Sequence, residues 1–451
     1  MKTSKHILSS YNVFKELKDS VVGINLIEQI FFSLEKDRYK LLIEHKNNVD
    51  SIRKINEPFY QVMMKLGVII PEEDDKSFYE KSLFSRRMTL FRDPFYRLTI
   101  NPTLNCNFSC WYCYEQHTKR YISKEILTRI LKLITYILKE KQIQHFHLDW
   151  FGGEPLLCYS TAIEPITLFA KNECHKYGIK FTSGMTTNGY LISDDKLDFF
   201  KKVNMNSFQI TLDGPKYIHD ITRHTSNKVG SYDKIVENIH LLAKKMNPEN
   251  LCLRINYTLE NLPYIEEIIH SFDQRIRHRI KVLLQQVWQD EINEKVKIED
   301  IYKLKELFKN NGFKVEESFL NKNGEPTCYA DTLNQAVINY DGRVFKCTAI
   351  NFEKEKEDGY LTESGNIHWN AALYNKLLYV TFENQHCKRC TYLPICYGPC
   401  HKKIFHYLNG NDFEKFCFKH GIEENLNFLI KKFSRVQRPY MPLDELEKYE
   451  I

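Results

Sequence analysis

Cysteine is the residue whose spacing carries the most chemistry in this 451-residue chain, which contains 13 of them. Three stand close together in the run CNFSCWYC, at Cys106, Cys110 and Cys113. Three thiolates on one short loop can hold three corners of a cubane iron–sulfur cluster and leave the fourth iron open to another ligand. The competing interpretation is structural zinc, for which His117 is the candidate fourth ligand. Spacing alone leaves both interpretations open.

A second set of seven cysteines lies near the C-terminus. It comprises Cys328, Cys347, Cys387, Cys390, Cys396, Cys400 and Cys417. Pairs of the form CxxC commonly bind zinc, so a zinc ribbon competes with iron–sulfur ligation here as well. Thiols at such short spacings indicate metal or redox chemistry in a reducing compartment, because a secreted disulfide scaffold is shorter and richer in cysteine.

The middle of the chain must position the first set. Residues 96–315 alternate strand and helix patterns at intervals of about 30 residues, which is typical of parallel βα repeats. Expected strands are 96–101, 146–151, 180–186, 208–212, 252–258 and 280–287, with helices at 123–140, 161–177, 193–203 and 232–245. A doubly wound sheet and a partial barrel both fit. Polar and glycine-rich segments follow the strands, which favours a barrel-like site at their C-terminal ends.

The first 95 residues contain no cysteine and are interpreted as a small separate unit. Apolar spacing predicts helices at 26–34 and 59–66. Residues 67–71 read as a short strand closed by proline, and the charged segment 72–92 reads as a linker. Small helices with a short hairpin indicate a winged-helix-like domain, although an additional helical cap fits the pattern equally well.

Composition excludes two broad classes of protein. Hydrophobic residues make up 43% and charged residues 27%, which excludes a disordered chain. No apolar run approaches the roughly 18 residues of a membrane helix, and the first residues lack the apolar core of a secretory signal. We therefore expect a cytoplasmic protein without membrane contact. The net charge of +6 is spread without a long basic block, so no nucleic-acid partner is expected.

The first cysteine set and the segments after it resemble the radical S-adenosylmethionine (SAM) superfamily. The signature CxxxCxΦC, with Tyr112 as its aromatic residue, is followed by WFGGEP, TTNGYL, ITLDGP and RINYTLEN, so the resemblance spans residues 96–315. It implies a 4Fe–4S cluster on Cys106, Cys110 and Cys113, whose open iron is chelated by the SAM amino and carboxylate groups. An electron then cleaves SAM to methionine and a 5′-deoxyadenosyl radical.

The resemblance also implies contacts with SAM. Gly152 and Gly153 let the backbone approach the SAM amino group, and Glu154 balances its positive charge. Arg223 is expected to pair with the carboxylate through its bidentate guanidinium, although a surface ion pair is the alternative for this residue. The remaining implied contacts are Tyr112, Asn188, Thr211, Asn256 and Gln286.

The second cysteine set resembles the SPASM domain of radical SAM maturases, and all seven positions of that pattern are filled. The resemblance implies two auxiliary 4Fe–4S clusters, which makes three clusters in all. The distal cluster is assigned to Cys387, Cys390, Cys396 and Cys417, and the proximal cluster to Cys328, Cys347 and Cys400. Some members have an eighth cysteine, but residues 318–327 contain none. The proximal cluster is therefore expected to have an open iron or a non-cysteine ligand.

The expected fold is α/β: a partial (β/α)6 TIM-like barrel at 96–315, an N-terminal winged-helix-like domain at 1–95 and a C-terminal iron–sulfur SPASM domain at 316–451. The resemblance implies an oxidoreductase that matures ribosomally made peptides (RiPPs) by installing a thioether or carbon–carbon crosslink. Its expected partners are a precursor peptide, whose leader binds the N-terminal domain as an added strand, and a reductant such as flavodoxin or ferredoxin.

Two alternative activities remain. The segment CYADTLNQAVINYDGRVFKC resembles anaerobic sulfatase maturases, which form formylglycine, but those enzymes carry an aspartate base directly after the second cysteine, where this chain has Thr348. Peptide epimerisation needs a hydrogen-atom donor, usually a thiol. Cys158 is the one candidate, since Cys174 and Cys252 are expected to be packing residues. A cluster protein that only binds the leader is disfavoured by the intact signatures.

Overall fold

The computed structural model describes residues 5–92, 94–246, 248–289, 296–316, 328–402 and 413–435. The chain forms two compact units. The larger consists of Leu90–Glu317 and Tyr329–Leu377, and the smaller of Met1–Thr89, Ser318–Cys328 and Leu378–Ile451. The division into three domains at 95/96 and 315/316 stays a prediction.

The larger unit is built on an 11-stranded sheet in which six parallel strands follow one another in chain order. They are β6 (Phe95–Asn101), β7 (His145–Trp150), β8 (Lys180–Thr187), β9 (Met205–Thr211), β10 (Asn250–Tyr257) and β11 (Ile280–Gln286). All six predicted strands are thus confirmed to within a few residues. A strand order that never reverses excludes the doubly wound alternative and is that of the predicted partial barrel.

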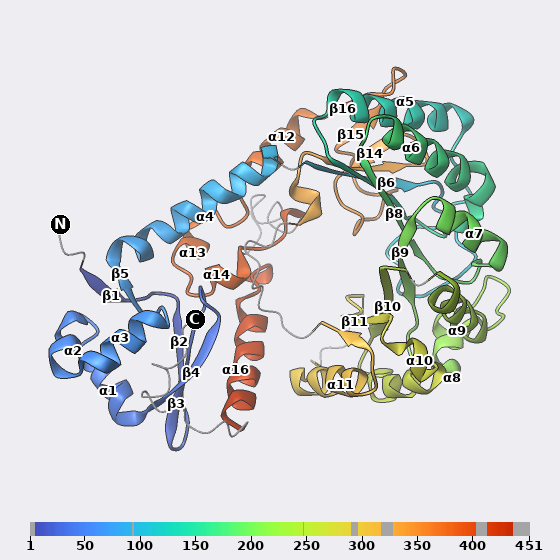
Figure 1. The fold of residues 1–451 in the computed structure, drawn as a ribbon. Helices are drawn as coiled ribbons and strands as arrows, with labels where there is room; N and C mark the ends of the chain where they lie inside the picture. The colour runs from blue at the N-terminus through green and yellow to red at the C-terminus, as the bar shows by residue number, and fades with distance from the viewer. Residues whose placement is uncertain are drawn as a thin grey trace. The chain divides into compact units, whose positions relative to one another are not determined.

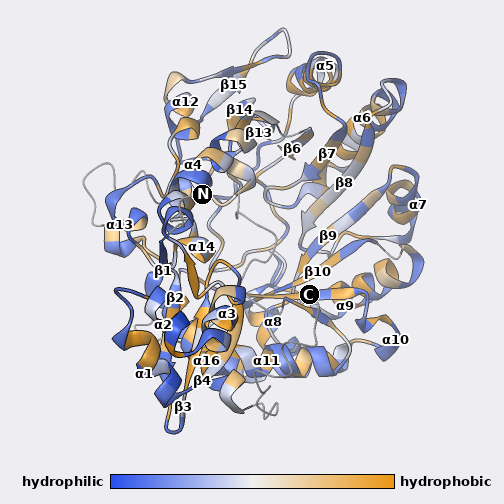
Figure 2. Cartoon of the chain, turned by 60° about the vertical axis from the view of Figure 1, so that its left-hand side comes forward, coloured by the Kyte–Doolittle hydropathy of each residue, from blue (hydrophilic) through white to orange (hydrophobic). Residues whose placement is uncertain are grey.

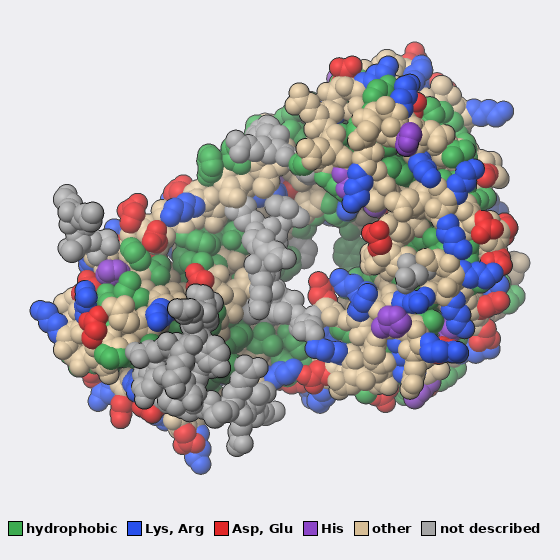
Figure 3. Space-filling model, in the orientation of Figure 1, with side chains coloured by type: hydrophobic (Ala, Val, Ile, Leu, Met, Phe, Trp, Pro, Cys, Tyr) green, Lys and Arg blue, Asp and Glu red, His purple; other side chains and the backbone are tan. Residues whose placement is uncertain are grey.

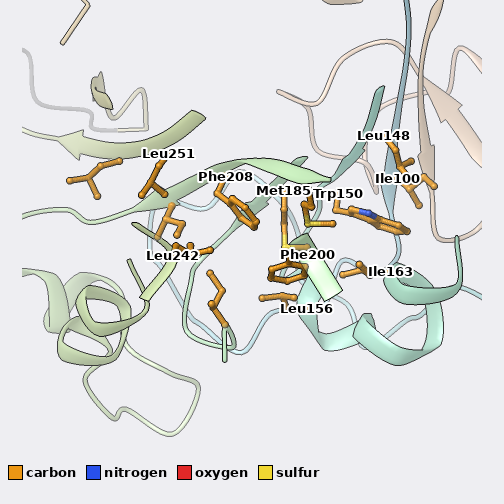
Figure 4. Packing of buried hydrophobic residues seen from close by; sticks show 14 of the residues in the cluster. Ile100, Leu148, Trp150, Leu156, Ile163, Met185, Phe200, Phe208, Leu242 and Leu251 are labelled. Atoms are coloured by element: carbon orange, nitrogen blue, oxygen red, sulfur yellow. The ribbon is translucent and has the colours of Figure 1, made fainter. Parts of the chain in front are cut away.

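Helices follow these strands and cover one face of the sheet (Figure 1). They include α5 (Lys124–Glu140), α6 (Glu164–Lys176), α7 (Asp194–Lys202) and α9 (Tyr232–Leu241). Strand β7 shows how the sequence separates the two faces: Leu148 and Trp150 are fully buried in the core of Figure 4, whereas His147 and Asp149 alternate with them. Side chains of a strand point alternately to opposite faces. The apolar set therefore packs against the helices, and the polar set faces the barrel interior.

The sheet continues past β6 into the C-terminal part of the larger unit. Strand β13 (Gln335–Asn339) is parallel to β6. Antiparallel strands β14 (Arg343–Phe345), β15 (Gly359–Leu361) and β16 (Ile367–Trp369) follow. Gly342 makes the turn before β14 with a φ of +85°, where a Cβ would stand 2.9 Å from Cδ1 of Ile126. The hairpin that precedes Cys347 is therefore a fixed extension of the barrel sheet.

The smaller unit contains a three-stranded antiparallel sheet of β2 (Asn12–Glu16), β3 (Ser20–Asn25) and β4 (Ile30–Glu35). Strands β1 (His6–Leu8) and β5 (Ile69–Pro71) form a separate pair. Its N-terminal helices are α1 (Lys36–Glu44), α2 (Asp50–Ile55), α3 (Glu57–Lys65) and α4 (Glu72–Arg92). Helix α16 (Lys419–Arg435) lies on β3 and β4, a region rich in hydrophobic residues in Figure 2.

Two predictions for the N-terminal segment are wrong, while the helix at 59–66 and the strand at 67–71 are confirmed as α3 and β5. The predicted helix at 26–34 is instead a turn followed by β4, because burial of Phe32 and Leu34 at alternate positions satisfies a strand. The predicted linker at 72–92 is the helix α4. Its buried residues Tyr79 and Leu83, one helical turn apart, supply the apolar contact that a charged composition concealed.

One hydrophobic core joins the two ends of the chain in the smaller unit. Tyr11, Ile24 and Tyr79 from the N-terminal segment pack together with Phe382 and Leu393 from the cysteine-rich segment. The hydroxyl of Tyr79 also donates to the Phe382 carbonyl at 3.4 Å. The first 89 residues therefore share their core with the segment that carries most of the second cysteine set.

The surface is typical of a chain with mixed charge. On the face drawn in Figure 3, Lys and Arg side chains alternate with Asp and Glu over the helices of the larger unit. Among the residues that the structure describes, no helix is both long and apolar enough to cross a bilayer.

Candidate functional site

The first three cysteines lie on the loop that joins β6 to α5, at the C-terminal end of the barrel strands. The loop is fixed by a bridge between Phe108 and Thr225 and by a 2.9 Å hydrogen bond from the Ser226 N–H to the Asn107 carbonyl. The Phe108 side chain is only 1% exposed and anchors the loop in the barrel core. The three cysteines therefore lie on a loop that is held in place by contacts with residues 225 and 226.

Burial raises the pKa of all three thiols, that of Cys113 to about 12. The sulfur of Cys113 lies 3.4 Å from Nε2 of His117, the candidate fourth ligand of a zinc site. A single zinc ion holds each sulfur at about 2.3 Å, and no three His, Cys, Asp or Glu side chains of the described residues are arranged around one such point. Ligation of an iron–sulfur cluster stays a prediction, and it requires these thiols to lose their protons.

The glycine pair after β7 adopts backbone angles that favour glycine. Gly152 has a φ of +80° and Gly153 a φ of +41°. A Cβ on Gly153 would stand 2.2 Å from the Asn105 carbonyl oxygen, so only glycine lets the cysteine loop come this close. The Gly153 N–H donates to Oε2 of Glu115 at 2.7 Å. Glu115, which the sequence analysis did not single out, thereby ties the cysteine loop to the glycine pair.

Glu154 is fully buried, and both of its carboxylate oxygens accept hydrogen bonds from this chain. The donors are the N–H of Leu156 at 2.9 Å, the N–H of Asn188 at 2.8 Å and the hydroxyl of Thr187 at 2.8 Å. Burial raises the pKa of Glu154 to about 7, although these bonds favour its charged form. Glu154 therefore ties the loop after β7 to the end of β8, and its contact with SAM stays a prediction.

Four residues form a polar network at the C-terminal ends of β9 and β10. The Tyr112 hydroxyl donates to Oδ2 of Asp213 and accepts from Nη1 of Arg223 at 2.6 Å and Nδ2 of Asn256 at 3.1 Å. Oδ1 of Asp213 accepts from the Asn256 N–H at 3.1 Å. Three predicted SAM contacts, Tyr112, Arg223 and Asn256, are therefore brought into direct contact. Asp213, inside the motif ITLDGP, was missed.

Polar side-chain atoms at this end of the barrel lack hydrogen-bond partners. Within the described residues, Nε of Arg223 and both side-chain polar atoms of Asn101, the last residue of β6, are buried without a hydrogen-bond partner. Such atoms cost free energy unless a further group pairs with them. Together with the close backbone at Gly152 and Gly153, they fit a ligand that carries a carboxylate and an amino group, as SAM does.

The other predicted SAM contacts lie apart from the network. Asn188 donates from Nδ2 to Oδ1 of Asn107 at 2.7 Å, and the same nitrogen lies 3.8 Å from the Cys106 sulfur, so it does more than form a turn. Thr211 ends β9 and is 8% exposed. Gln286 ends β11 with an exposed side chain. Neither Thr211 nor Gln286 joins the network, and both stay predictions as SAM contacts.

In the smaller unit, four cysteines line one cavity of about 340 Å³. They are the four predicted distal ligands, Cys387, Cys390, Cys396 and Cys417. Asn384 holds Cys387 through its Oδ1, which accepts from the Cys387 N–H at 2.9 Å, and its Nδ2, which lies 3.4 Å from the sulfur. Burial raises the pKa of Cys387 to about 12, and the other three thiols contribute to the shift. The fold thus gathers these thiols around one space.

The predicted proximal ligands are divided between the two units. Cys347 follows β14 in the larger unit, whereas Cys328 and Cys400 belong to the smaller one. Residues 318–327, which contain no eighth cysteine, lie outside the described residues. Ligation of the proximal cluster, with an open iron or a non-cysteine ligand, therefore stays a prediction.

The three cysteines left without a cluster differ in their surroundings. Cys158 is 1% exposed and Cys174 is fully buried, and both belong to the apolar core of the larger unit. The Cys158 sulfur lies 3.8 Å from the Pro102 carbonyl oxygen. Cys252, by contrast, lines a cavity inside the barrel. The barrel interior therefore presents the thiol of Cys252, while the role of Cys158 as hydrogen-atom donor stays a prediction.

Comparison with known proteins identifies the domain that carries this site. Residues 100–272 match the Radical SAM superfamily. A cysteine-type anaerobic sulfatase-maturating enzyme of Clostridium novyi is 27% identical over 363 residues, which cover 72% of this chain and 93% of that enzyme. An uncharacterised protein of Synechocystis sp. is 31% identical over 183 residues, which cover 39% of this chain and less than half, 44%, of that protein.

Two solved structures share the fold. Native anSMEcpe with bound AdoMet aligns with a TM-score of 0.56 at 20% identity, covering 75% of this chain and 100% of that one. Streptococcus suis SuiB bound to its precursor peptide SuiA aligns with a TM-score of 0.51 at 15% identity, covering 89% and 97%. The chain therefore carries a radical SAM domain, is homologous to the anaerobic sulfatase-maturating enzymes, and has the fold of radical SAM/SPASM enzymes.

Proposed function

We propose that this protein is a radical SAM/SPASM maturase that removes hydrogen from a ribosomally made peptide and installs a thioether or carbon–carbon crosslink. The observation that carries the proposal is the convergence of the cysteine triplet, the glycine pair and the Tyr112 network at one end of the barrel. SAM bound there would supply the 5′-deoxyadenosyl radical. SuiB, which was solved with a precursor peptide, supports a peptide as the substrate.

Each group of side chains has a part in this proposal. The first three cysteines would hold a 4Fe–4S cluster with one open iron, and Arg223 would pair with the SAM carboxylate while Tyr112 and Asp213 hold its guanidinium in place. The barrel would have to exclude water around the bound substrate to protect a carbon radical from side reactions. The substrate would give up one hydrogen atom, then one proton and one electron, and the two auxiliary clusters of the second cysteine set would accept the electron.

The test is anaerobic co-expression with a precursor peptide encoded by a small open reading frame beside the gene. Each crosslink should lower the peptide mass by two hydrogens. Fragmentation by mass spectrometry would locate the joined residues. With the purified enzyme, flavodoxin or ferredoxin would be supplied as the electron donor in place of dithionite. Recovery of unmodified precursor from an enzyme that still cleaves SAM would contradict peptide crosslinking.

We also propose that the N-terminal segment binds the leader peptide at an edge of its small sheet. Strand β2 is an edge strand of the order β2-β3-β4, and main-chain pairing to such an edge is a common mode of peptide recognition. Deletion of residues 1–90 is a poor test, because it would also remove part of the core shared with Phe382 and Leu393. A proline scan of β2 should lower leader affinity while the iron content stays unchanged; unchanged affinity would contradict this assignment.

Formylglycine formation is the second candidate, because the match to the Clostridium novyi enzyme spans 93% of that relative. Against it stands Thr348, whose Oγ1 lies 2.6 Å from the Tyr329 hydroxyl and whose carbonyl accepts from the Tyr114 hydroxyl at 3.1 Å. A hydroxyl held in this way is a poor substitute for a carboxylate base. Hydrazide labelling of a co-expressed sulfatase would detect the aldehyde, and a crosslinked precursor would not react.

A further inference from the structure

A cavity of about 270 Å³ lies inside the barrel of the larger unit, apart from the network at the strand ends. Inward-facing side chains of β6 to β11 line it, among them Arg97, His147, Asp149, Gln209 and Lys281. The interior of a closed barrel is ordinarily filled by layers of branched apolar side chains. A hollow, polar interior instead indicates a place where a ligand group is received.

The cavity begins close to the candidate site. Asp149 stands one residue before the end of β7, and Gln209 stands two residues before the end of β9. A strand rises about 3.3 Å per residue, so these side chains lie roughly 3–7 Å along their strands from the loops that carry the glycine pair and Asp213. Lys281, the second residue of β11, is in register with Cys252 of β10, which is in register with Gln209 of β9. A substrate that reacts at the strand ends can therefore extend a neighbouring group into the cavity.

The acidic group in the lining is already paired within the protein. Oδ1 of Asp149 lies 2.9 Å from Nε2 of His147, and its Oδ2 lies 3.6 Å from Nε of Arg97. The Arg97 guanidinium is also held over the rings of Phe95 and Tyr329, 5.6 Å and 5.7 Å from their centroids. The charge of Asp149 is therefore not available to balance a second cation.

Lys281 is the remaining basic residue in the lining of the cavity. Neither its ammonium nor the side-chain amide of Gln209 takes part in a hydrogen bond or ion pair within the part of the chain that the structure describes. Arg254, on the neighbouring strand, donates from Nε to Asn256 and adds positive charge to the same interior. The other nearby carboxylate, Glu316, is exposed to solvent, where its field is screened. The cavity thus keeps a positive charge and a free amide donor.

We propose that this cavity binds a carboxylate of the peptide substrate, with Lys281 as its ion-pair partner and Gln209 and Arg97 as flanking donors. The inference rests on the proposed function, since it needs a peptide inside the barrel, and it adds the substrate's chemical class. The carboxylate belongs either to an Asp or Glu side chain beside the modified residue or to the peptide C-terminus. An ion pair in a partly enclosed cavity is screened less by solvent than one on an open surface.

The test measures binding of short probe peptides to the anaerobically reconstituted holoprotein with SAM present. The probes are acetyl-Gly-Glu-Gly-amide, its Gln counterpart, and acetyl-Gly-Gln-Gly with a free C-terminus. At least one carboxylate probe should bind about tenfold more tightly than the amidated Gln probe, which corresponds to about 1.4 kcal/mol. Tighter binding of acetyl-Gly-Glu-Gly-amide assigns the cavity to an acidic side chain of the substrate. Tighter binding of acetyl-Gly-Gln-Gly assigns the cavity to the peptide C-terminus.

Variants connect the preference to the cavity. Lys281→Met should abolish the preference for carboxylate probes, and Lys281→Arg should keep most of that preference. Lys139→Met, on the exposed face of α5, should leave the preference unchanged. Circular dichroism and iron content show whether each variant is folded and loaded. Equal affinity for all three probes, or a preference that survives Lys281→Met in a folded protein, overturns the assignment.

Failure of the proposed function has a different signature. A precursor that loses two hydrogens, together with probes that bind equally, would remove the carboxylate cavity and leave peptide maturation standing. A carboxylate preference together with an unmodified precursor would do the reverse. The binding experiment and the mass measurement therefore test the two proposals separately.

Discussion

The two cysteine groups of this protein differ in how many thiols each gathers and in what surrounds them. In the larger unit, Cys106, Cys110 and Cys113 lie on a loop beside the Tyr112 network, in which an Arg223 nitrogen has no partner among the described residues. In the smaller unit, four thiols line one cavity bounded by aromatic side chains such as Tyr392 and Phe413. We therefore expect the first group to leave a coordination position for a ligand and the second group to supply four sulfur ligands.

This difference is the one expected between a catalytic site and a structural or electron-transfer site. Catalytic metal sites keep a coordination position open, whereas structural sites are closed by protein ligands. The fold around each group agrees with this division. The open group belongs to the polar end of a barrel, while Cys387 is part of the hydrophobic core that joins the two ends of the chain. We therefore expect loss of a thiol to affect chemistry in the first group and stability in the second.

Removal of a thiol from the open group should have the largest effect. Cys110→Ala should lower SAM cleavage at least about 1,000-fold, or about 4 kcal/mol in activation free energy, because a cluster cannot form on two cysteines. Chromatographic measurement of 5′-deoxyadenosine checks this. Cys174→Ala, the same change at a fully buried cysteine of the core, should retain cleavage. Cleavage that survives in Cys110→Ala would refute the assignment.

The closed group should respond in stability. Cys387→Ala should lower the free energy of unfolding by at least about 3 kcal/mol, since it removes a core side chain and the bound cluster together. SAM cleavage without peptide should change less than about threefold. Anaerobic thermal denaturation and a cleavage assay measure the two effects. Loss of SAM cleavage in Cys387→Ala at an unchanged denaturation midpoint would contradict the proposed difference between the two groups.

Glu154 offers a pH test of the open group. Burial raises its pKa from 4.5 to about 7, so the folded chain binds this proton more tightly than the unfolded chain does. Stability without SAM should therefore fall as the pH rises, by about 2 kcal/mol between pH 5.5 and 7.5. In Glu154→Gln this part of the pH dependence should disappear. Denaturation curves of the two proteins that change in parallel with pH would show that the carboxyl does not titrate as inferred.

The Tyr112 hydroxyl should have the smallest effect of the four. Tyr112→Phe removes three hydrogen bonds, to Asp213, Arg223 and Asn256. Because Arg223 would then be held less firmly, we expect SAM binding to lose the equivalent of one hydrogen bond, about 1 kcal/mol. SAM should then bind about fivefold more weakly, while the iron content stays unchanged. Tyr136→Phe, on an exposed part of α5, is the matched control. A SAM dissociation constant equal to that of the native protein would exclude the network from SAM binding.

The sequence predicted those parts of the fold whose burial is local. The barrel strands were found from local apolar runs, as in β7, where Phe146, Leu148 and Trp150 are buried at alternate positions. The position of helix α4 did not follow from a local pattern, because Tyr79 and Leu83 are buried by residues about 300 positions later in the chain. Residues 26–34 were ambiguous, since Ile27, Phe31 and Leu34 have the spacing of one helical face, whereas Phe32 and Leu34 alternate as in a strand.

The candidate site shows the same division. Cysteine spacing and the glycine pair could be recognised from the sequence because their residue types are unusual in those patterns. Glu115, Asp213 and Asn101 are ordinary polar residues, and they gain significance only when the loops after different strands converge. The one signal available was position, since Glu115 follows the third cysteine by two residues and Asp213 lies within a recognised motif.

The most direct test of the account is reductive cleavage of SAM by the purified, anaerobically reconstituted protein. With dithionite as the electron source, the native chain should form 5′-deoxyadenosine and methionine in equal amounts, and the Cys110→Ala protein should form neither. Electron paramagnetic resonance would establish in the same sample that the clusters are present. A native protein that carries its clusters, binds SAM and forms no 5′-deoxyadenosine would contradict the assignment of the open cysteine group as the catalytic centre.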